Sequence, residues 1–429
     1  MTLLLLVVLL VVLILVGAPI AYSLLIVAVG GLLLQLGPTP TMGVLQTSPY
    51  RSSASFLLTT IPMFVLMAEF LAGGRMAQDI FKAGHVWLGH MRGGMAVATT
   101  VASALLAALL GSSPAAAATM SSIAVPEMRK YGYDDRLSLG IVASAGTLAV
   151  IIPPSLILIL YGILTENSIG QLFVAGLVPG VMTAIGYLLL INIWSRLEPN
   201  IAPAASARFT KEEKRASLRP VLPALLLIFV VLGGIYSGFV TPSEAGALGA
   251  FGAFVIGITF SGLRRKGVLS ALERTSRTTA MIFAIVIAAS IFGYYLTSTQ
   301  IAQNAISWVQ ESQFPTLAVL LVILFIYLIL GAFLDPVSIL VVTLPLAYPL
   351  VTSLGYDAIW FGIIATKMIE IGLVTPPVGI NVFVTAGAIN ADLKDAFAGA
   401  LRFVLVDIIV VVLLIAFPEI ITFLPNLLF

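Results

Sequence analysis

Two proline pairs, Pro153-Pro154 and Pro376-Pro377, interrupt long apolar stretches of the chain. A proline inside a helix removes a backbone hydrogen bond and clashes with the preceding turn, so each pair is predicted to break a helix. In an apolar environment the freed carbonyl groups need partners, unless they line a cavity or bind a cation. A tolerated kink is the alternative reading of each pair. Two pairs favour a functional use, as do the polar and small residues that flank the second pair: Gly372, Thr375, Gly379 and Asn381.

Two further apolar stretches, 93–128 and 316–352, are broken in the middle, at Gly111-Ser-Ser-Pro114 and at Gly331-Ala-Phe-Leu-Asp-Pro336. The glycine and serines of the first break can expose carbonyl and hydroxyl oxygens at the end of one half-helix. The proline suits the start of the next half-helix, whose positive dipole end would face an anion. Close helix packing at the four alanines that follow is the alternative, and it is compatible with ion binding.

Five charged residues lie in or near apolar stretches: Glu69, Asp335, Lys367, Glu370 and Asp407. Charged side chains at such positions are rare and often functional. Asp335, at the second break, is the strongest candidate for an ion-binding or gating role. Lys367 and Glu370 are three residues apart on one helical face and are predicted to pair with each other. Glu69 and Asp407 are interpreted as anchors of helix packing or of interface ends.

The composition of the chain indicates the environment in which these residues lie. The chain has 429 residues, of which 60% are hydrophobic and 9% charged. Soluble domains carry about 25% charged residues, so lipid must be the main solvent of this chain. A net charge of +2 gives no reason to expect nucleic acid, and the absence of cysteine excludes disulfides and thiol chemistry. The sequence therefore predicts an all-α polytopic membrane protein embedded in a lipid bilayer.

Ten apolar runs are predicted to cross the membrane as helices. The first is interpreted as a retained span, with a cleaved signal peptide as the alternative, because it lacks a basic start and a small-residue cleavage site. Each half of the two centrally broken stretches is about 15 residues, or about 22 Å, which is short of a bilayer core of about 30 Å. Each broken stretch is therefore predicted to be a re-entrant hairpin. The predicted spans are 2–16, 20–36, 55–73, 139–165, 169–196, 221–238, 243–261, 278–296, 357–389 and 395–420.

Basic residues predict the orientation. Lys and Arg concentrate in 208–219 and 264–277, which two predicted spans separate, so both segments are placed on the cytoplasmic face. The same counting places the basic residues of 75–92 and 129–136 on that face. Between residues 278 and 366 the chain has no Lys or Arg. The loops that flank the second hairpin are therefore predicted to face outward.

A shift of 223 residues superimposes proline and glycine landmarks of the two halves, including both proline pairs and the sequence Gly-Tyr-Asp at 132–134 and 355–357. Five predicted crossings separate equivalent points, so the copies are predicted to have opposite orientation. Inverted repeats with broken helices are a recurring design of secondary transporters. The predicted division is 1–54 for N-terminal scaffold helices, 55–196 for the first repeat, 197–277 for cytoplasmic loops and two linking scaffold helices, and 278–429 for the second repeat.

Two mixed polar and apolar segments, Met76–Met91 and Ile301–Val309, each precede a hairpin and are predicted to be interfacial amphipathic arms. Both histidines, His85 and His90, lie in the first arm. An intramembrane serine protease would need a buried Ser–His pair, so this position argues against it.

The residues resemble the large membrane subunit of tripartite ATP-independent periplasmic (TRAP) transporters along nearly the whole chain. The ordered matches include the segments 17–21, 61–69, 89–94, 151–155, 234–245, 333–336 and 370–381. This resemblance implies an elevator-type Na⁺ symporter for an organic anion in a bacterial inner membrane, with no catalytic activity and no organic cofactor. It also implies two partners, a periplasmic substrate-binding protein and a separate small four-helix membrane subunit.

The resemblance implies binding residues by position. One Na⁺ site would involve Gly111, Ser112, Ser113, Gly146 and Thr147. A second would involve Gly331, Asp335, Gly372 and Thr375, with Asn381 nearby. Substrate is expected between the hairpin tips and the proline pairs, at Pro114, Pro153, Pro154, Ser155, Pro376, Pro377, Gly379 and Asn381. The chain departs from the usual pattern at Ala149-Val150 and at Lys367.

Two other functions remain open at the level of sequence, a stand-alone ion-coupled anion symporter and a passive channel. Flux that does not saturate, or that needs no sodium, would favour the channel. The sequence does not identify the cargo, and C4-dicarboxylates, sialic acid, other sugar acids and sulfonates are all compatible with it.

Overall fold

The computed structural model describes residues 2–203 and 209–429, and within these ranges it contains helices, turns and loops but no strand. Arg208, at the start of a predicted cytoplasmic segment, lies outside the described residues. Seven helices of the described chain are long and apolar enough to cross a membrane, or up to nine if each of two bent pairs is one span. The predicted all-α, multi-span fold class is confirmed.

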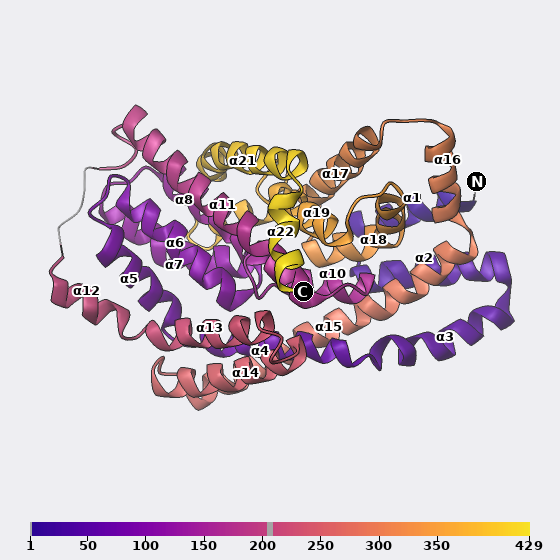
Figure 1. Cartoon of the computed structure of the whole chain (residues 1–429), viewed down its shortest axis with the longest axis horizontal. Helices are drawn as coiled ribbons and strands as arrows, with labels where there is room; N and C mark the ends of the chain where they lie inside the picture. Colours follow the sequence, from indigo (N-terminus) through magenta and orange to yellow (C-terminus); the bar gives the residue numbers. More distant parts are fainter. Residues whose placement is uncertain (1, 204–208) are drawn as a thin grey trace.

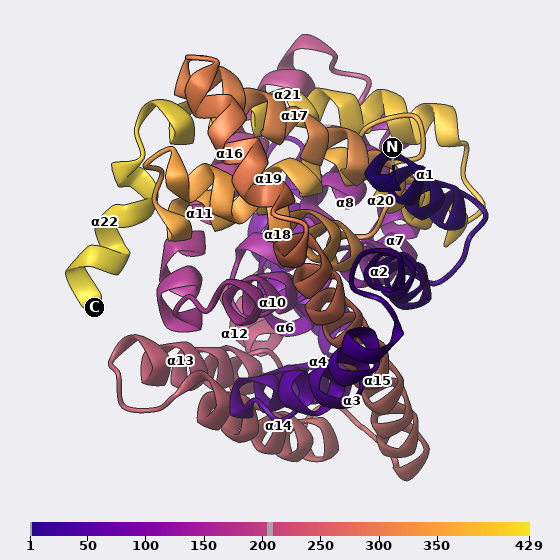
Figure 2. The same ribbon diagram turned by 90° about the vertical axis from the view of Figure 1, so that its right-hand side faces the viewer.

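One side of the molecule is a layer of long helices (Figures 1 and 2). α14 (Pro242–Thr259) packs on α4 (Thr60–Ala72) and α13 (Leu222–Tyr236). α15 (Arg265–Ser298) packs on α4 and on two N-terminal helices, α2 (Ile20–Leu36) and α3 (Pro38–Ser53). A hydrogen bond between the Thr60 and Ser243 hydroxyls, 2.6 Å long, lies in the α4–α14 contact. We refer to α2, α3, α4, α13, α14 and α15 as the scaffold layer.

The two centrally broken stretches form helix pairs that turn back on themselves. The first pair is α6 (Gly94–Leu110) with α7 (Ser113–Lys130), and the second is α17 (Thr316–Phe333) with α18 (Pro336–Ser353). The helices have 17 or 18 residues, which is more than the predicted 15. An 18-residue helix is about 27 Å long, and α17 and α18 pass a length and composition test for spans. Length alone therefore does not distinguish these pairs from crossing helices.

Both proline pairs break helices, as predicted. The first broken helix consists of α8 (Asp135–Gly146), the single turn α9 (Leu148–Ile151) and α10 (Leu156–Thr165). The second consists of α19 (Ala358–Leu373) and α20 (Ile380–Gly387). The Pro153-Pro154 and Pro376-Pro377 peptide bonds are both cis. Asp134 and Asp357 occupy the equivalent N-cap positions of α8 and α19, where each accepts a hydrogen bond from a backbone N–H of the first turn.

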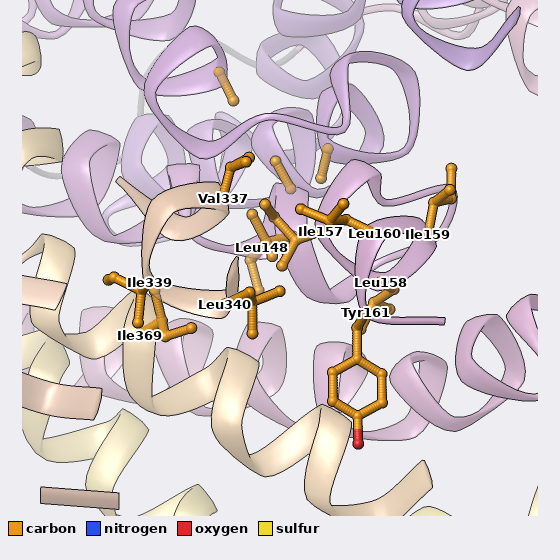
Figure 3. Packing of buried hydrophobic residues seen from close by; sticks show 14 of the residues in the cluster. Leu148, Ile157, Leu158, Ile159, Leu160, Tyr161, Val337, Ile339, Leu340 and Ile369 are labelled. Carbon is orange, nitrogen blue, oxygen red and sulfur yellow. The ribbon is translucent and has the colours of Figure 1, made fainter. Parts of the chain in front are cut away.

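Helix boundaries repeat at the offset seen in the sequence. α18 begins and ends 223 residues after α7, and α19 begins 223 residues after α8. The packing is also reciprocal, because α20 of the second half contacts α7, and α10 of the first half contacts α18. Figure 3 shows Val337 and Leu340 of α18 in one apolar cluster with Leu148 and Ile157 of the first broken helix. Each hairpin is thus held by the broken helix of the other half.

The remaining helices connect these units. The predicted amphipathic arms are α5 (Met76–Leu88) and α16 (Ile301–Glu311). α3 was not predicted, because its sequence contains three prolines and many polar residues; two of these prolines lie at its start, where they are tolerated. The other helices are η1 (Phe56–Thr59, a 3₁₀ turn), α1 (Thr2–Leu15), α11 (Ile169–Leu197), α12 (Lys211–Leu218), α21 (Leu393–Ala416) and α22 (Glu419–Leu428).

Candidate functional site

A cavity of about 420 Å³ lies where both hairpin tips meet the scaffold layer. The first tip contributes residues 111–115 and the second contributes 335–337. Pro154 of the first proline pair lines the same space, and the scaffold side is formed mainly by α4 and by Thr278 and Met281 of α15. Ends of half-helices from both halves of the chain therefore face a single cavity.

The first tip is shaped by Gly111, whose φ of 58° is the left-handed conformation that ends α6. A Cβ atom at this position would lie 3.2 Å from the Pro154 carbonyl oxygen, so the tip packs tightly on the first proline break. Ser112 is the N-cap of α7, and Pro114 lies in its first turn. The free N–H groups of that turn give this end of α7 a partial positive charge beside the cavity.

The residues predicted for the first Na⁺ site come together. A Cβ atom on Gly146, at the end of α8, would lie 3.2 Å from the Ser113 carbonyl oxygen. Thr147 follows directly, between α8 and α9, and its hydroxyl donates to the Ser144 carbonyl over 2.6 Å. The structure therefore places oxygen-bearing groups of the α6–α7 tip and of the α8–α9 junction side by side.

Three of the four residues predicted for the second Na⁺ site lie where α17 meets α19. Gly331 and Gly372 let the backbones of α17 and α19 touch, since a Cβ atom on Gly372 would lie 2.6 Å from the Gly331 Cα atom. Thr375 lies just beyond, and its hydroxyl donates to the Ile371 carbonyl over 2.6 Å. Asp335 lines the cavity, and it caps α18 by accepting hydrogen bonds from the Ser338 backbone N–H (3.1 Å) and the Ser338 hydroxyl.

Of the eight residues predicted for substrate binding, two line the cavity. Pro114 and Pro154 line the cavity. Pro153 and Ser155 are buried, and the Ser155 hydroxyl accepts a hydrogen bond from the Leu158 N–H as the N-cap of α10. Three further residues lie outside the cavity lining: Pro376 and Pro377 are exposed, and Gly379 is buried, with its N–H donating to the Ala332 carbonyl.

Asn381 is fully buried at the start of α20, where its side-chain amide donates to the Ser113 hydroxyl over 2.6 Å. Two residues of this helix therefore bond to α7, because the Ser121 hydroxyl donates to the Thr385 carbonyl over 2.6 Å. Asn381 thus joins the second broken helix to the first hairpin. The structure places it beside the first predicted Na⁺ site, bonded to a residue that lines the cavity, although Asn381 itself is not part of the lining.

The predicted pairing of Lys367 with Glu370 is wrong. The Lys367 ammonium forms an ion pair of 2.5 Å with Asp407 of α21, and the Tyr187 hydroxyl of α11 donates to the other Asp407 oxygen over 2.7 Å. These side chains are almost completely buried. The three-residue spacing suggested that Lys367 would pair with Glu370. The packing of α19 on α21 brings the Asp407 carboxylate close to Lys367, and this carboxylate is the one that pairs with it. Glu69 does anchor helix packing, because it pairs with Arg274 of α15 over 2.6 Å.

These features define a multi-span helical membrane protein in which both hairpin tips and the first broken helix meet at one cavity. The family model described as "Tripartite ATP-independent periplasmic transporter, DctM component" matches residues 7–420. The chain therefore belongs to the family of TRAP transporter large permease subunits, and its relatives are named as transporter subunits, not enzymes.

Curated relatives support this assignment. The chain is 37% identical over 398 residues to a C4-dicarboxylate TRAP transporter large permease protein of Pseudomonas aeruginosa, with 92% of each chain covered. It is 33% identical to an isethionate TRAP transporter permease protein of Oleidesulfovibrio alaskensis, covering 89% of this chain but only 59% of that longer protein. A sialic acid TRAP transporter permease protein of Haemophilus influenzae is 29% identical, with 96% of this chain and 66% of that protein covered.

Among solved structures, the Alcanivorax borkumensis YdaH transporter has a similar fold. The TM-score is 0.60 at 14% sequence identity, and the match covers 90% of both chains. At this level of identity the likeness concerns the fold alone.

Proposed function

We propose that this chain carries an organic anion together with Na⁺ into the cell, as the transport subunit of a three-part system in the bacterial inner membrane. The observation that carries the proposal is the convergence of both hairpin tips and the first proline break on one cavity. The family assignment supplies the general activity, transport through a large permease subunit. The coupling ion, the cargo and the mechanism are inferred from the chemistry of the site.

The charges around the cavity argue for a cation as co-substrate. Two carboxylates line it, Glu69 and Asp335, whereas no Lys or Arg occurs among the described lining residues. Glu69 is neutralised by Arg274, which leaves Asp335 as a negative charge facing the space where an anion would bind. The N-terminus of α7 offers only a partial positive charge of about half a unit. A bound cation would supply the charge that an anionic cargo needs.

The position of the cavity supports an elevator mechanism. It lies between the scaffold layer and the unit made by the hairpins and broken helices, not inside either one. Hydrogen bonds and helix contacts join the two hairpins to the broken helices, as in the Asn381–Ser113 bond. Such a unit could slide as one body against the scaffold layer and carry ions and cargo with it.

We further propose that a periplasmic substrate-binding protein delivers the cargo, and that a separate small four-helix membrane subunit supports the scaffold layer. The Oleidesulfovibrio alaskensis relative, named DctMQ, is longer than this chain, which is consistent with a second membrane component fused in that protein. The names of the three relatives include a dicarboxylate, a sulfonate and a sugar acid. All three are organic anions, and this is the cargo class we propose.

Uptake by proteoliposomes that contain the large and small subunits tests the proposal directly. With the binding protein and a panel of radiolabelled organic anions outside, an inward Na⁺ gradient should drive accumulation above the equilibrium level. Replacement of Na⁺ by choline should reduce uptake to the level of protein-free vesicles. Undiminished, saturable uptake in choline would exclude Na⁺ coupling, and flux that never saturates would favour a channel.

A further inference from the structure

Glu370 on α19 is a buried carboxyl that the site described above does not use. Only 1% of its surface is exposed, and neither carboxyl oxygen accepts a hydrogen bond from any residue that the structure describes. An isolated charge in a membrane protein interior is costly unless an opposite charge or hydrogen bonds compensate it. The geometry of Glu370 therefore calls for a partner.

The neighbouring lysine does not fill that role. The Lys367 ammonium forms an ion pair with Asp407 at 2.5 Å, and the Tyr187 hydroxyl donates a hydrogen bond to the second oxygen of that carboxylate. Lys367 and Asp407 lie close enough to act on Glu370 electrostatically, but their opposite charges largely cancel. When all three side chains are ionised, the cluster carries one net negative charge, and that charge resides on Glu370.

Other oxygen atoms gather beside this carboxyl. The Ser113 hydroxyl at the start of α7 lies close to this carboxyl, and it also accepts the hydrogen bond from the Asn381 amide nitrogen. The Asn381 carbonyl oxygen Oδ1 is fully buried and has no hydrogen-bond partner among the described residues. Two buried acceptors without partners, one from α19 and one from α20, thus lie around a single hydroxyl of the first hairpin.

We propose that Glu370, the Asn381 Oδ1 atom and the Ser113 hydroxyl form a binding site for a monovalent cation, Na⁺. Carboxylate, amide and hydroxyl oxygens are the ligands that hard cations take. One monovalent ion cancels the net charge of the cluster, whereas a divalent ion would reverse it. The inference rests on the proposed function and deepens it, because it assigns Glu370, a carboxylate that neither sequence-derived Na⁺ site includes, as a ligand.

The site offers a simple route to coupling. Ser113 belongs to the first hairpin, while Glu370 and Asn381 belong to the second broken helix, so a cation here joins the two halves of the chain. Without the cation the buried negative charge would oppose the nearby binding of an anion and loosen this contact. Cargo binding and cation binding should then favour each other.

Thermal stability of the purified full-length subunit in detergent tests the site without a transport assay. Titration of Na⁺ into choline buffer should raise the melting temperature of the wild-type protein, because a ligand that binds only the folded state stabilises it. In Glu370→Gln the Na⁺ concentration for half of this effect should rise roughly tenfold or more. Glu273→Gln, which alters an exposed pair with Arg277 on α15, is the matched control and should titrate like wild type.

If Glu370→Gln does not fold, two other variants test the same site. Glu370→Asp keeps the charge on a shorter side chain, and Asn381→Ser removes the Oδ1 atom, so both should weaken the response to Na⁺. Wild-type titrations in the folded variants would overturn the proposal. Stabilisation of the wild-type protein by acid in place of Na⁺, lost in Glu370→Gln, would assign a proton to the carboxyl and would also overturn it.

The inference and the proposed function fail in different ways. Sodium-dependent uptake together with an unchanged Na⁺ titration in Glu370→Gln would remove this site and leave the function in place. Uptake that does not depend on Na⁺, together with a Na⁺-dependent melting temperature that requires Glu370, would confirm the site and exclude Na⁺ coupling.

Discussion

Asp335 combines two roles at the tip of the second hairpin. Its carboxylate caps α18 by accepting from Ser338, and it faces the cavity between the hairpins and the scaffold layer. Replacement by alanine removes both the cap and the charge. Replacement by asparagine keeps a good N-cap and removes only the charge, so the pair of variants separates stability from ion binding.

We expect Asp335→Asn to lower Na⁺-driven uptake severalfold at nearly unchanged thermal stability. Asp335→Ala should lower uptake as much and also destabilise the protein by about 1 kcal/mol, the usual cost of a lost N-cap. Uptake in proteoliposomes and melting temperature in detergent measure the two effects. Asp357→Asn, at the N-cap of α19 and outside the cavity lining, is the control. Wild-type uptake by Asp335→Asn would remove this carboxylate from the site.

The Lys367–Asp407 pair makes a prediction about stability. Lys367→Met should destabilise the protein by about 3–5 kcal/mol, because it leaves a buried carboxylate without its counter-charge. The double variant Lys367→Met/Asp407→Asn removes both charges and should recover most of the loss. Melting temperatures of the two variants in detergent provide the measurement. Equal destabilisation of the single and double variants would show that lost packing, not the unpaired charge, is the cause.

At the scale of the elements, the first hairpin tip packs closely on the first broken helix in the cavity wall. Gly111 has a left-handed backbone, and a Cβ atom there would lie 3.2 Å from the Pro154 carbonyl oxygen. Gly238 has a similar φ of +69° in a surface turn with nothing within 4 Å of such an atom. The two glycines therefore differ in their neighbours and not in backbone strain.

We predict that Gly111→Ala reduces uptake by an order of magnitude or more, whereas Gly238→Ala leaves it near wild type. Both variants carry a left-handed strain of about 1–2 kcal/mol, so the difference reports displacement of the tip from Pro154. Initial uptake rates at equal protein content measure this difference. Equal rates in the two variants would mean that the tip can move away from Pro154 without loss of function.

Much of this element-level organisation could be predicted from the sequence. The positions of proline and glycine predicted both hairpin breaks and both broken helices, because these residues act on the local backbone conformation. The partner of Lys367 could not be predicted, since Asp407 lies 40 residues away and reaches it only through helix packing. The polar helix α3 was missed for a similar reason. Its tertiary contact with α15 stabilises a segment whose composition suggests a loop.

For the site, the sequence indicated which residues belong to each broken helix but not how they group. The two segments of the first predicted Na⁺ set, 111–113 and 146–147, meet where Gly146 packs on Ser113. Asn381 joins them from the other half of the chain, an association that depends on α20 packing against α7. Pairings of this kind arise from the arrangement of the two halves, which no local pattern contains.

At the scale of the whole molecule, the account depends on two copies of one unit that face each other with opposite orientation. The repeated helix boundaries and the reciprocal contacts of α20 with α7 and of α10 with α18 support two related copies. The orientation itself was predicted from basic residues and the number of crossings. It decides whether the hairpins enter the bilayer from opposite faces.

Single cysteines at equivalent hairpin ends measure this orientation most directly, because the natural chain has no cysteine. Lys130, at the end of α7, and Ser353, at the end of α18, are both exposed and 223 residues apart. With a thiol reagent that cannot cross the membrane, Ser353→Cys should be labelled in right-side-out vesicles and Lys130→Cys only in inverted ones. Gln313→Cys and Lys214→Cys should mark the outer and inner faces in the same way. Labelling of both hairpin ends from one face would contradict the inverted arrangement, and with it the proposed mechanism.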